Sequence, residues 1–574
     1  MIALKSMKMK IVRKCPMNKQ GILIAVFLMC GLIVQAQNNL PSDTFRVVKA
    51  YQPTLVDADK ITSEPEIVDT FKLEADLDYQ FFGKQMPVSF EPELISAARI
   101  KGEPLVKLYN GYARAAVGNT MMPLAEVYYA NKRSDKYALG AHVKYMNQRE
   151  LSEYKSSEMS RTHFEVFGKR FWKTNTFEGN INYDMDAMNY YGYYQMPRLV
   201  QDELPSDEIE QQYNRLGAHF KLKSTKQDSF NLRHEVNAAY QMTTNKAGNQ
   251  ENYFKASGKL SQFKNAELYQ LDLMVDYNKY DLSEESAILA MQPQISTIGE
   301  RFRVNAGLGI FMNSGPTDGF HFYPLAEVKY NVIENILVPY AGIKGEIRRN
   351  NYNTITRENP FVAPEIELEN SNQKHNIYLG VRGTLSKKIS FNTSASKIST
   401  ENEYFYVKRP TENLIQSKAF YLTYDKVDEL SFKGELVYRL DDKIKVYALG
   451  EYFNYETRNE EEAWHRPELK VSASGEYNLK DKLIARLDLF YWGEQYAQRV
   501  TEITTNQNLD ILDRKYGVET LAPIFDVNLG FEYRYTKKLS AFIQFNNIGG
   551  INYEKYQDYP LQGFNVFGGL TYGF

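Results

Sequence analysis

The sequence predicts an all-β protein, a transmembrane antiparallel β-barrel of about 22 strands, within a range of about 18–24. From about residue 105 onward, segments of roughly ten residues alternate apolar and polar side chains. Strands of about 9–11 residues fit a tilted crossing of a bilayer, whereas strands of soluble sandwiches usually have about five or six. An export signal precedes this pattern and an apolar, aromatic strand ends it. Since only helices and closed barrels satisfy every backbone group in lipid, we predict a barrel with its polar faces turned inward.

The composition excludes several other classes of protein. The 574 residues carry 69 basic and 71 acidic side chains, a net charge of −2, with 43 Tyr, 32 Phe and 3 Trp. A helical membrane protein would be far more apolar than a mean hydropathy of −0.50, and a disordered chain would not contain so many aromatic residues. Near-neutral charge gives no support for nucleic-acid binding, so we expect no nucleic-acid partner.

Residues 1–36 have the pattern of a secretory signal peptide. A basic stretch is followed by an apolar run of 14 residues, and we predict cleavage between Ala36 and Gln37. The two cysteines, Cys15 and Cys30, both lie in this segment. We therefore expect an exported chain without disulfides.

The exported chain divides into an arm and a barrel. Residues 37–104 contain six prolines, which disfavour long helices and predict an extended arm in the periplasm or the lumen. Residues 105–574 form the predicted barrel. Its alternation is interrupted between residues 313 and 374, and the region 400–425 fits a hairpin that rises above the membrane.

Connections of two lengths separate the predicted strands. Short polar links fit tight periplasmic turns; they lie at 132–135, 173–175, 386–388, 441–442, 480–482 and 536–538. Longer polar stretches fit extracellular loops; they lie at 187–211, 281–299, 349–374, 454–466 and 493–520. Aromatic residues gather at strand ends, as at Tyr190 and Tyr191, which predicts a girdle at the membrane interface.

One polar face stands out as a candidate binding surface. The strand that begins near Phe177 turns a ladder of four polar side chains inward: Asn180, Asn182, Asp184 and Asp186. Such a ladder could coordinate a cation or a sugar. The alternative is a solvated lumen wall whose acids pair with Lys and Arg on neighbouring strands.

The end of the chain carries a resemblance to a known family. The final strand is largely apolar at every second position, through Phe564, Val566, Leu570, Tyr572 and Phe574, and resembles the terminal strand that the barrel-assembly machinery recognises. The stretches at 542–548 (FIQFNNI), 552–553 and 559–563 (YPLQG) resemble the last strands of TonB-dependent receptors, in the style of Bacteroidetes barrels. The motifs cover about 540–574, and the alternating pattern covers 105–574. The resemblance implies an outer-membrane protein that contacts outer-membrane lipid and binds or passes a solute.

The N-terminal region departs from that family. Its receptors have a plug domain of well over 100 residues before the barrel, whereas only about 65–70 residues precede the first strand here, without a plug-like Ile-Arg-Gly motif. The sequence therefore does not decide whether TonB is a partner of this chain. A periplasmic or surface protein is a further expected partner.

The sequence gives no sign of catalysis. No His pair has the spacing of a compact metal site, and we find no G-x-S-x-G nucleophile motif. We therefore expect no enzyme, no catalytic residue, no cofactor and no metal. The histidines fit polar positions in the lumen or loops: His142, His163, His219, His234, His321, His375 and His465.

A barrel of this size poses a question about leakage. Its lumen is too wide to be filled by wall side chains, so the arm, in-folded loops or another protein must close it. One hypothesis is a transporter or receptor whose outer loops bind a nutrient. The alternative is a structural barrel in an assembly or secretion complex, with the arm docking periplasmic partners.

Overall fold

The computed structural model describes residues 108–574, except 120, 150–155, 193–208, 226–231, 334–335, 410–417, 442 and 506–510. The predicted signal peptide, its cleavage site at Ala36 and Gln37, and the arm lie outside the described residues. Within the described residues, no helix is both long and apolar enough to cross a membrane.

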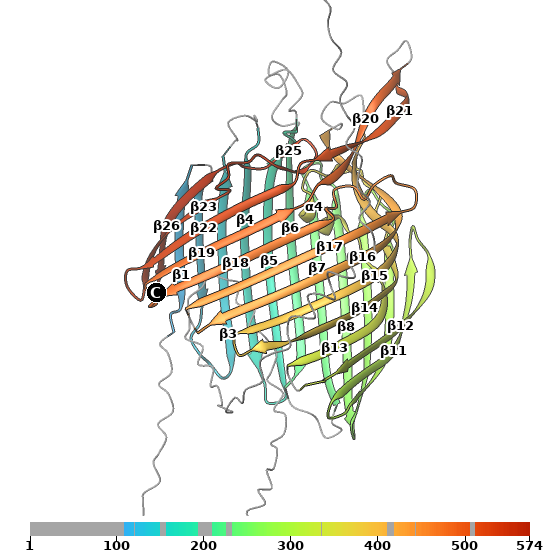
Figure 1. Cartoon of the computed structure of the whole chain (residues 1–574), viewed down its shortest axis with the longest axis vertical. Coiled ribbons are helices and arrows are strands. Elements are labelled where there is room, and N and C mark those ends of the chain that lie inside the picture. The colour runs from blue at the N-terminus through green and yellow to red at the C-terminus, as the bar shows by residue number, and fades with distance from the viewer. Residues whose placement is uncertain are drawn as a thin grey trace, which may run out of the picture. The chain divides into compact units, whose positions relative to one another are not determined.

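The structure is a closed ring of 22 antiparallel strands (Figure 1). Each strand pairs with its neighbours along the chain, and β1 (Gly111–Gly118) closes the ring by pairing with β26 (Asn565–Gly573). The prediction of an all-β barrel of about 22 strands is confirmed. The other strands of the ring are β2 (Met121–Ala130), β3 (Tyr137–Gln148), β4 (Met159–Phe171), β5 (Asn175–Asn189), β6 (Glu210–Ser224), β7 (Leu232–Asn245), β8 (Gln250–Lys264), β9 (Glu267–Tyr280), β10 (Ser286–Ile298), β11 (Phe302–Ser314), β12 (Gly319–Tyr330), β13 (Leu337–Arg348), β14 (Ser371–Ser386), β15 (Ile389–Lys408), β16 (Phe420–Leu440), β17 (Ile444–Thr457), β18 (Leu469–Leu479), β19 (Leu483–Trp492), β22 (Ile524–Arg534) and β23 (Leu539–Asn546).

Period-two alternation explains the two faces of the wall. On β4, Phe164 and Val166 are exposed on the outer surface, while His163 and Glu165 face the lumen. On β26, Leu570 and Tyr572 point outward in the same way. Exposed large apolar side chains recur on most strands of the ring. Water penalises such a surface, and the hydrocarbon of a bilayer suits it.

The two ends of the ring differ in their connections. At one end, the turn end, the described residues of the short links lie where the sequence predicts them; for example, 132–135 joins β2 to β3 and 480–482 joins β18 to β19. At the other end, the loop end, the connections include the helix α4 (Tyr352–Glu358) and two small sheets. These sheets are the hairpin of β20 (Gln495–Thr505) and β21 (Ile511–Leu521), and the pair of β24 (Glu554–Tyr556) and β25 (Tyr559–Pro560).

Two stretches that were predicted as loops form β-strands in the structure. Most of 281–299 is the wall strand β10, because Leu289, Met291 and Ile295 alternate on its outer face, while the inward Gln292, Gln294 and Ser296 made the stretch resemble a loop. The stretch 493–520 is largely the β20–β21 hairpin, which lies outside the ring. The region 400–425 contains extensions of β15 and β16, which are 20 and 21 residues long.

The interruption of the pattern between residues 313 and 374 has two physical causes. The pairing of β13 with β14 shifts register between Lys344 and Glu346, which moves the alternation by one residue. In addition, Tyr323 and Ile347 lie inside the lumen in a buried apolar cluster. When the inward face of a strand also carries apolar residues, the alternation of apolar and polar side chains that predicts the strand is lost.

Candidate functional site: a loop held across the mouth of the barrel

The connection between β13 and β14 does not leave the barrel but folds into its mouth. We call residues 349–370 the capping loop. Figure 1 shows α4 of this loop inside the ring of strands near the loop end. The helix begins at the N-cap Asn351, whose side chain accepts a hydrogen bond from the backbone N–H of Thr354 (2.8 Å).

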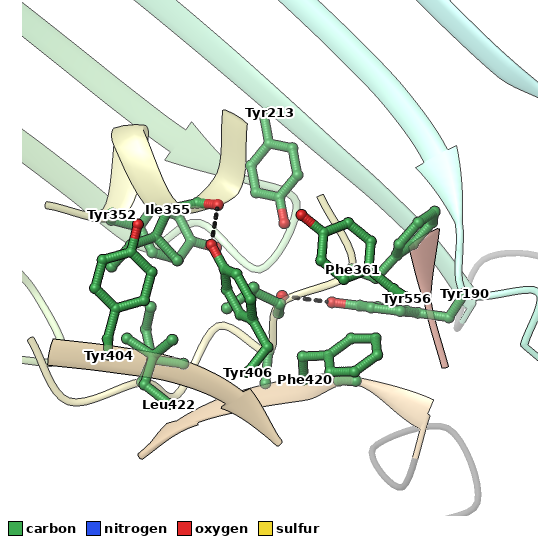
Figure 2. Packing of buried hydrophobic residues seen from close by; sticks show 14 of the residues in the cluster. Tyr190, Tyr213, Tyr352, Ile355, Phe361, Tyr404, Tyr406, Phe420, Leu422 and Tyr556 are labelled. Atoms are coloured by element: carbon green, nitrogen blue, oxygen red, sulfur yellow. Dashed lines mark hydrogen bonds between the residues drawn. The ribbon is translucent and has the colours of Figure 1, made fainter. Parts of the chain in front are cut away.

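Tyrosine hydroxyls hold the capping loop in place. An irregular loop has backbone carbonyls without partners of its own, and burying them is costly. Six tyrosines from the strands and loops around the mouth donate to carbonyls of the capping loop, two of which, those of Ile355 and Pro364, also accept a backbone N–H of the loop. The pairs are Tyr406–Ile355 (3.4 Å), Tyr556–Glu358 (2.8 Å), Tyr213–Pro360 (2.9 Å), Tyr190–Val362 (2.9 Å), Tyr280–Pro364 (2.7 Å) and Tyr424–Glu367 (2.9 Å). Figure 2 shows two of these bonds, from Tyr190 and Tyr406.

The rings of these tyrosines and their neighbours form one buried cluster that crosses the mouth. Tyr191, which follows β5, packs on Tyr559 with ring centroids 5.1 Å apart, and Tyr559 lies 5.9 Å from Phe420 of β16. Phe361 of the capping loop stacks on Tyr559 at 3.8 Å. Because β5 and β16 lie half a turn apart in a ring of 22 strands, the cluster bridges opposite walls.

Charged anchors tie the capping loop to the wall below. The carboxylate of Glu251 on β8 accepts hydrogen bonds from the backbone N–H groups of Tyr352 (2.6 Å) and Asn353 (2.8 Å), at the positive end of α4. Arg349 pairs with Asp276 of β9 at 2.7 Å, and both side chains are almost fully buried. A buried pair of this kind leaves an uncompensated charge when one partner is removed.

Two titratable groups at the mouth are kept neutral by burial. Burial raises the pKa of Tyr352 to about 12, so its hydroxyl stays protonated. Burial and the nearby charge of Lys408 lower the pKa of His465 to about 3. The neutral ring of His465 links three elements, because Nδ1 donates to the carbonyl of Tyr406 (3.1 Å) and Nε2 accepts from the N–H of Gln557 (3.3 Å).

A polar cavity of about 810 Å³ lies between the capping loop and the wall. Asn351 and Thr354 of the loop line it on one side, and the strands from β5 to β11, together with the end of β13, line it on the other. The wall contributes amides, acids and bases, namely Asn180, Asn182, His219, Glu235, Asn237, Gln241, Lys255, Lys259, Asp272 and Gln292. This lining suits a solute that forms hydrogen bonds.

The predicted polar ladder divides between this cavity and the anchors. Asn180 and Asn182 line the cavity. Asp184 pairs with His163 (2.5 Å) and with Arg357 of the capping loop (2.8 Å).

The last acid of the ladder belongs to a buried ion network. Asp186 pairs with Arg161 at 2.6 Å and with Arg215 at 2.5 Å. Arg215 is fully buried and also donates to Thr356 Oγ1 of α4 (3.2 Å). The acids of the ladder thus pair with cations and help to hold the capping loop.

The sequence did not reveal how the aromatic residues are used. Tyr190 and Tyr191 do not form a girdle at the interface; they are buried in the cluster, because their hydroxyls meet the carbonyls of Val362 and Pro560. A signal was present in the tyrosines near the ends of several predicted strands, but the capping loop that they share as a partner is 51 to 198 residues away in the sequence. The residues of the predicted assembly signal lie on or beside β26, and Phe564, Leu570, Tyr572 and Phe574 are exposed while Val566 is partly buried.

Solved structures similar to this chain share its fold. The siderophore receptor PirA from Acinetobacter baumannii matches with a TM-score of 0.61 and 10% identity, over 82% of this chain and 81% of that chain. The FrpB iron transporter from Neisseria meningitidis matches with a TM-score of 0.61 and 9% identity, over 82% of each chain. The ferripyoverdine receptor of the outer membrane of Pseudomonas aeruginosa matches with a TM-score of 0.56 and 11% identity, over 81% of this chain and 72% of that chain.

Sequence comparison adds nothing to these matches in fold. No protein-family model matches the sequence, and no curated protein matches it.

Proposed function

We propose that this chain is an outer-membrane receptor or transporter that binds a polar solute and passes it through the barrel. The observation that carries the proposal is the capping loop, which lies across the mouth above a polar cavity of about 810 Å³. The outward apolar surface supports a location in a membrane, and short turns opposite long loops support an outer membrane with the loops outside. The three solved structures described above, two receptors and an iron transporter, support the same function.

The cavity favours a hydrophilic solute. Its lining alternates amides with charged side chains of both signs, as at Asn237, Lys255 and Asp272. A large apolar ligand would leave these groups without partners. We therefore propose a solute rich in hydroxyl or amide groups, such as an oligosaccharide or a peptide.

Solute flux into proteoliposomes tests this function. The exported chain, starting at Gln37, is reconstituted with a panel of oligosaccharides and peptides of increasing size. We expect selective uptake or binding of one class of solute, and unselective flux when the capping loop and residues 37–104 are both removed. A wild-type chain that neither binds nor passes any member of the panel would contradict the proposal.

The firmness of the closure supports a second candidate function. Tyr352, Ile355 and Val362 have no exposed surface, as expected of a mouth that never opens. A structural barrel that docks periplasmic partners through residues 37–104 fits this observation. It predicts a stoichiometric protein partner in native membranes that is lost when residues 37–104 are deleted, and no solute uptake.

A further inference from the structure

Three side chains on the lumen wall form a cluster that the proposed function does not use. His142 of β3 and Glu165 of β4 are direct partners across the sheet, and His163 lies two residues before Glu165 on the same face. One potential ligand atom from each residue lies within 4.8 Å of the others. The rings of His142 and His163 have centroids 5.2 Å apart.

Each member of this cluster is oriented by a polar neighbour. His142 Nε2 lies 2.9 Å from Glu126 Oε1, and His163 Nδ1 lies 2.5 Å from Asp184 Oδ1. Asn180 Nδ2 donates to Glu165 Oε1 at 2.8 Å. Metal-ligating histidines almost always have a carboxylate or carbonyl partner of this kind, which fixes the ring and raises its basicity.

We propose that His142, His163 and Glu165 bind a divalent transition-metal ion, such as Zn²⁺, on the lumen wall. Two imidazoles and one carboxylate are a ligand set that Zn²⁺ takes up, and a fourth position would remain for water in the lumen. Ligand atoms that lie about 2.0–2.2 Å from one ion are at most about 4.4 Å apart. The three ligand atoms here lie within 4.8 Å of one another, so small side-chain rotations bring them to that distance.

The charges around the cluster balance, so the ligand set and its geometry carry the proposal. Lys144 is the cross-strand partner of His163, Arg114 is the cross-strand partner of Glu126, and Arg357 pairs with Asp184. These three cations offset the three acids Glu126, Glu165 and Asp184. The proposal goes beyond the transport of a solute, and binding of the ion can be measured whether or not the barrel transports anything.

Zinc titration of the exported chain, purified without a histidine tag, tests the proposal. We expect one Zn²⁺ ion per chain, measured by competition with a fluorescent chelator and by the visible absorption of bound Co²⁺. His142→Gln and His163→Gln each lower the affinity at least about 100-fold. Glu126→Gln, which removes the negative charge that both His142 and Tyr112 contact, lowers it about 10–100-fold.

His219→Gln is the matched control. His219 lines the polar cavity on β6 outside the cluster, and all seven histidines of the sequence lie in the described part of the chain. We expect this variant to bind Zn²⁺ like the wild type. Binding that survives both cluster variants, or no binding by a wild-type chain with an intact barrel by circular dichroism, would overturn the proposal.

Discussion

The turn end and the loop end of the barrel are built on different principles. At the turn end the contacts are local: Asn478 and Asp481, for instance, exchange two hydrogen bonds across three residues. At the loop end the contacts join distant parts of the chain, as between Tyr556 and Glu358, which are 198 residues apart. The turn end only reverses strands, whereas the loop end is a tertiary structure that closes the lumen. We therefore expect substitutions at the loop end to weaken closure of the lumen, and substitutions at the turn end to have little effect on it.

The largest effect is expected for the buried anchor of the capping loop. Arg349→Met leaves Asp276 buried without its cation, so the free energy that keeps the capping loop closed falls by about 3–5 kcal/mol. Amide hydrogen exchange of residues 349–370 measures this opening. Arg357→Met is the matched control, because Arg357 belongs to the same loop but its side chain is 45% exposed, and we expect at most about 1 kcal/mol. Equal effects of the two substitutions would refute a role for burial.

A smaller effect is expected for the tyrosine hydroxyls. Tyr213→Phe removes the donor to the carbonyl of Pro360 and keeps the ring, which weakens closure by about 1–3 kcal/mol. Tyr240→Phe is the comparison, since its hydroxyl bonds to Asn252 on the exposed outer face. The same exchange measurement should find the capping loop unchanged in this variant. If Tyr213→Phe also leaves exchange unchanged, the hydroxyl does not hold the loop.

The third effect depends on pH. The pKa of His465 is about 3 when the mouth is closed and near its ordinary value when the loops open. The open state therefore binds a proton between these values, and closure weakens as pH falls below about 6, by at most about 1.4 kcal/mol per pH unit. Fluorescence of the buried neighbour Trp464, with Trp172 and Trp492 replaced by Phe, reports this loosening. His465→Gln should remove the pH dependence; if that dependence remains, another group causes it.

The smallest effect is expected at the turn end. Replacing Lys387 and Lys388 by Asn and Gly in the turn between β14 and β15 should change stability by less than about 0.5 kcal/mol. Urea unfolding in lipid vesicles, followed by tryptophan fluorescence, measures this difference. A destabilisation as large as that of Tyr213→Phe would show that the turn end also carries tertiary structure.

The same contrast explains what could be predicted from the sequence. The wall strands and the turns at 386–388 or 480–482 depend on neighbours in the chain, and both were predicted. The ring contacts that link Tyr191 to Tyr559 and Tyr559 to Phe420 join three segments that are far apart in the sequence. The alternation of apolar and polar residues along each strand therefore did not predict them. For the polar ladder, the alternative of acids that pair with Lys and Arg on neighbouring strands fits Asp186, but its partners Arg161 and Arg215 could be named only from the strand register. The cluster of His142 and His163 was missed because their pairing depends on the register of β3 with β4.

The central claim is that the capping loop closes the barrel, and single-channel conductance tests it most directly. The exported chain is compared in planar bilayers with a variant in which residues 351–368 are replaced by a short Gly-Ser linker, each with and without residues 37–104. A variant whose β20–β21 hairpin is shortened by joining Arg499 to Gly517 serves as the control. We predict closed channels whenever the capping loop is present, including in the chain without residues 37–104, and open channels when both segments are removed. A chain that conducts with the capping loop intact, or stays closed without both segments, would contradict the claim.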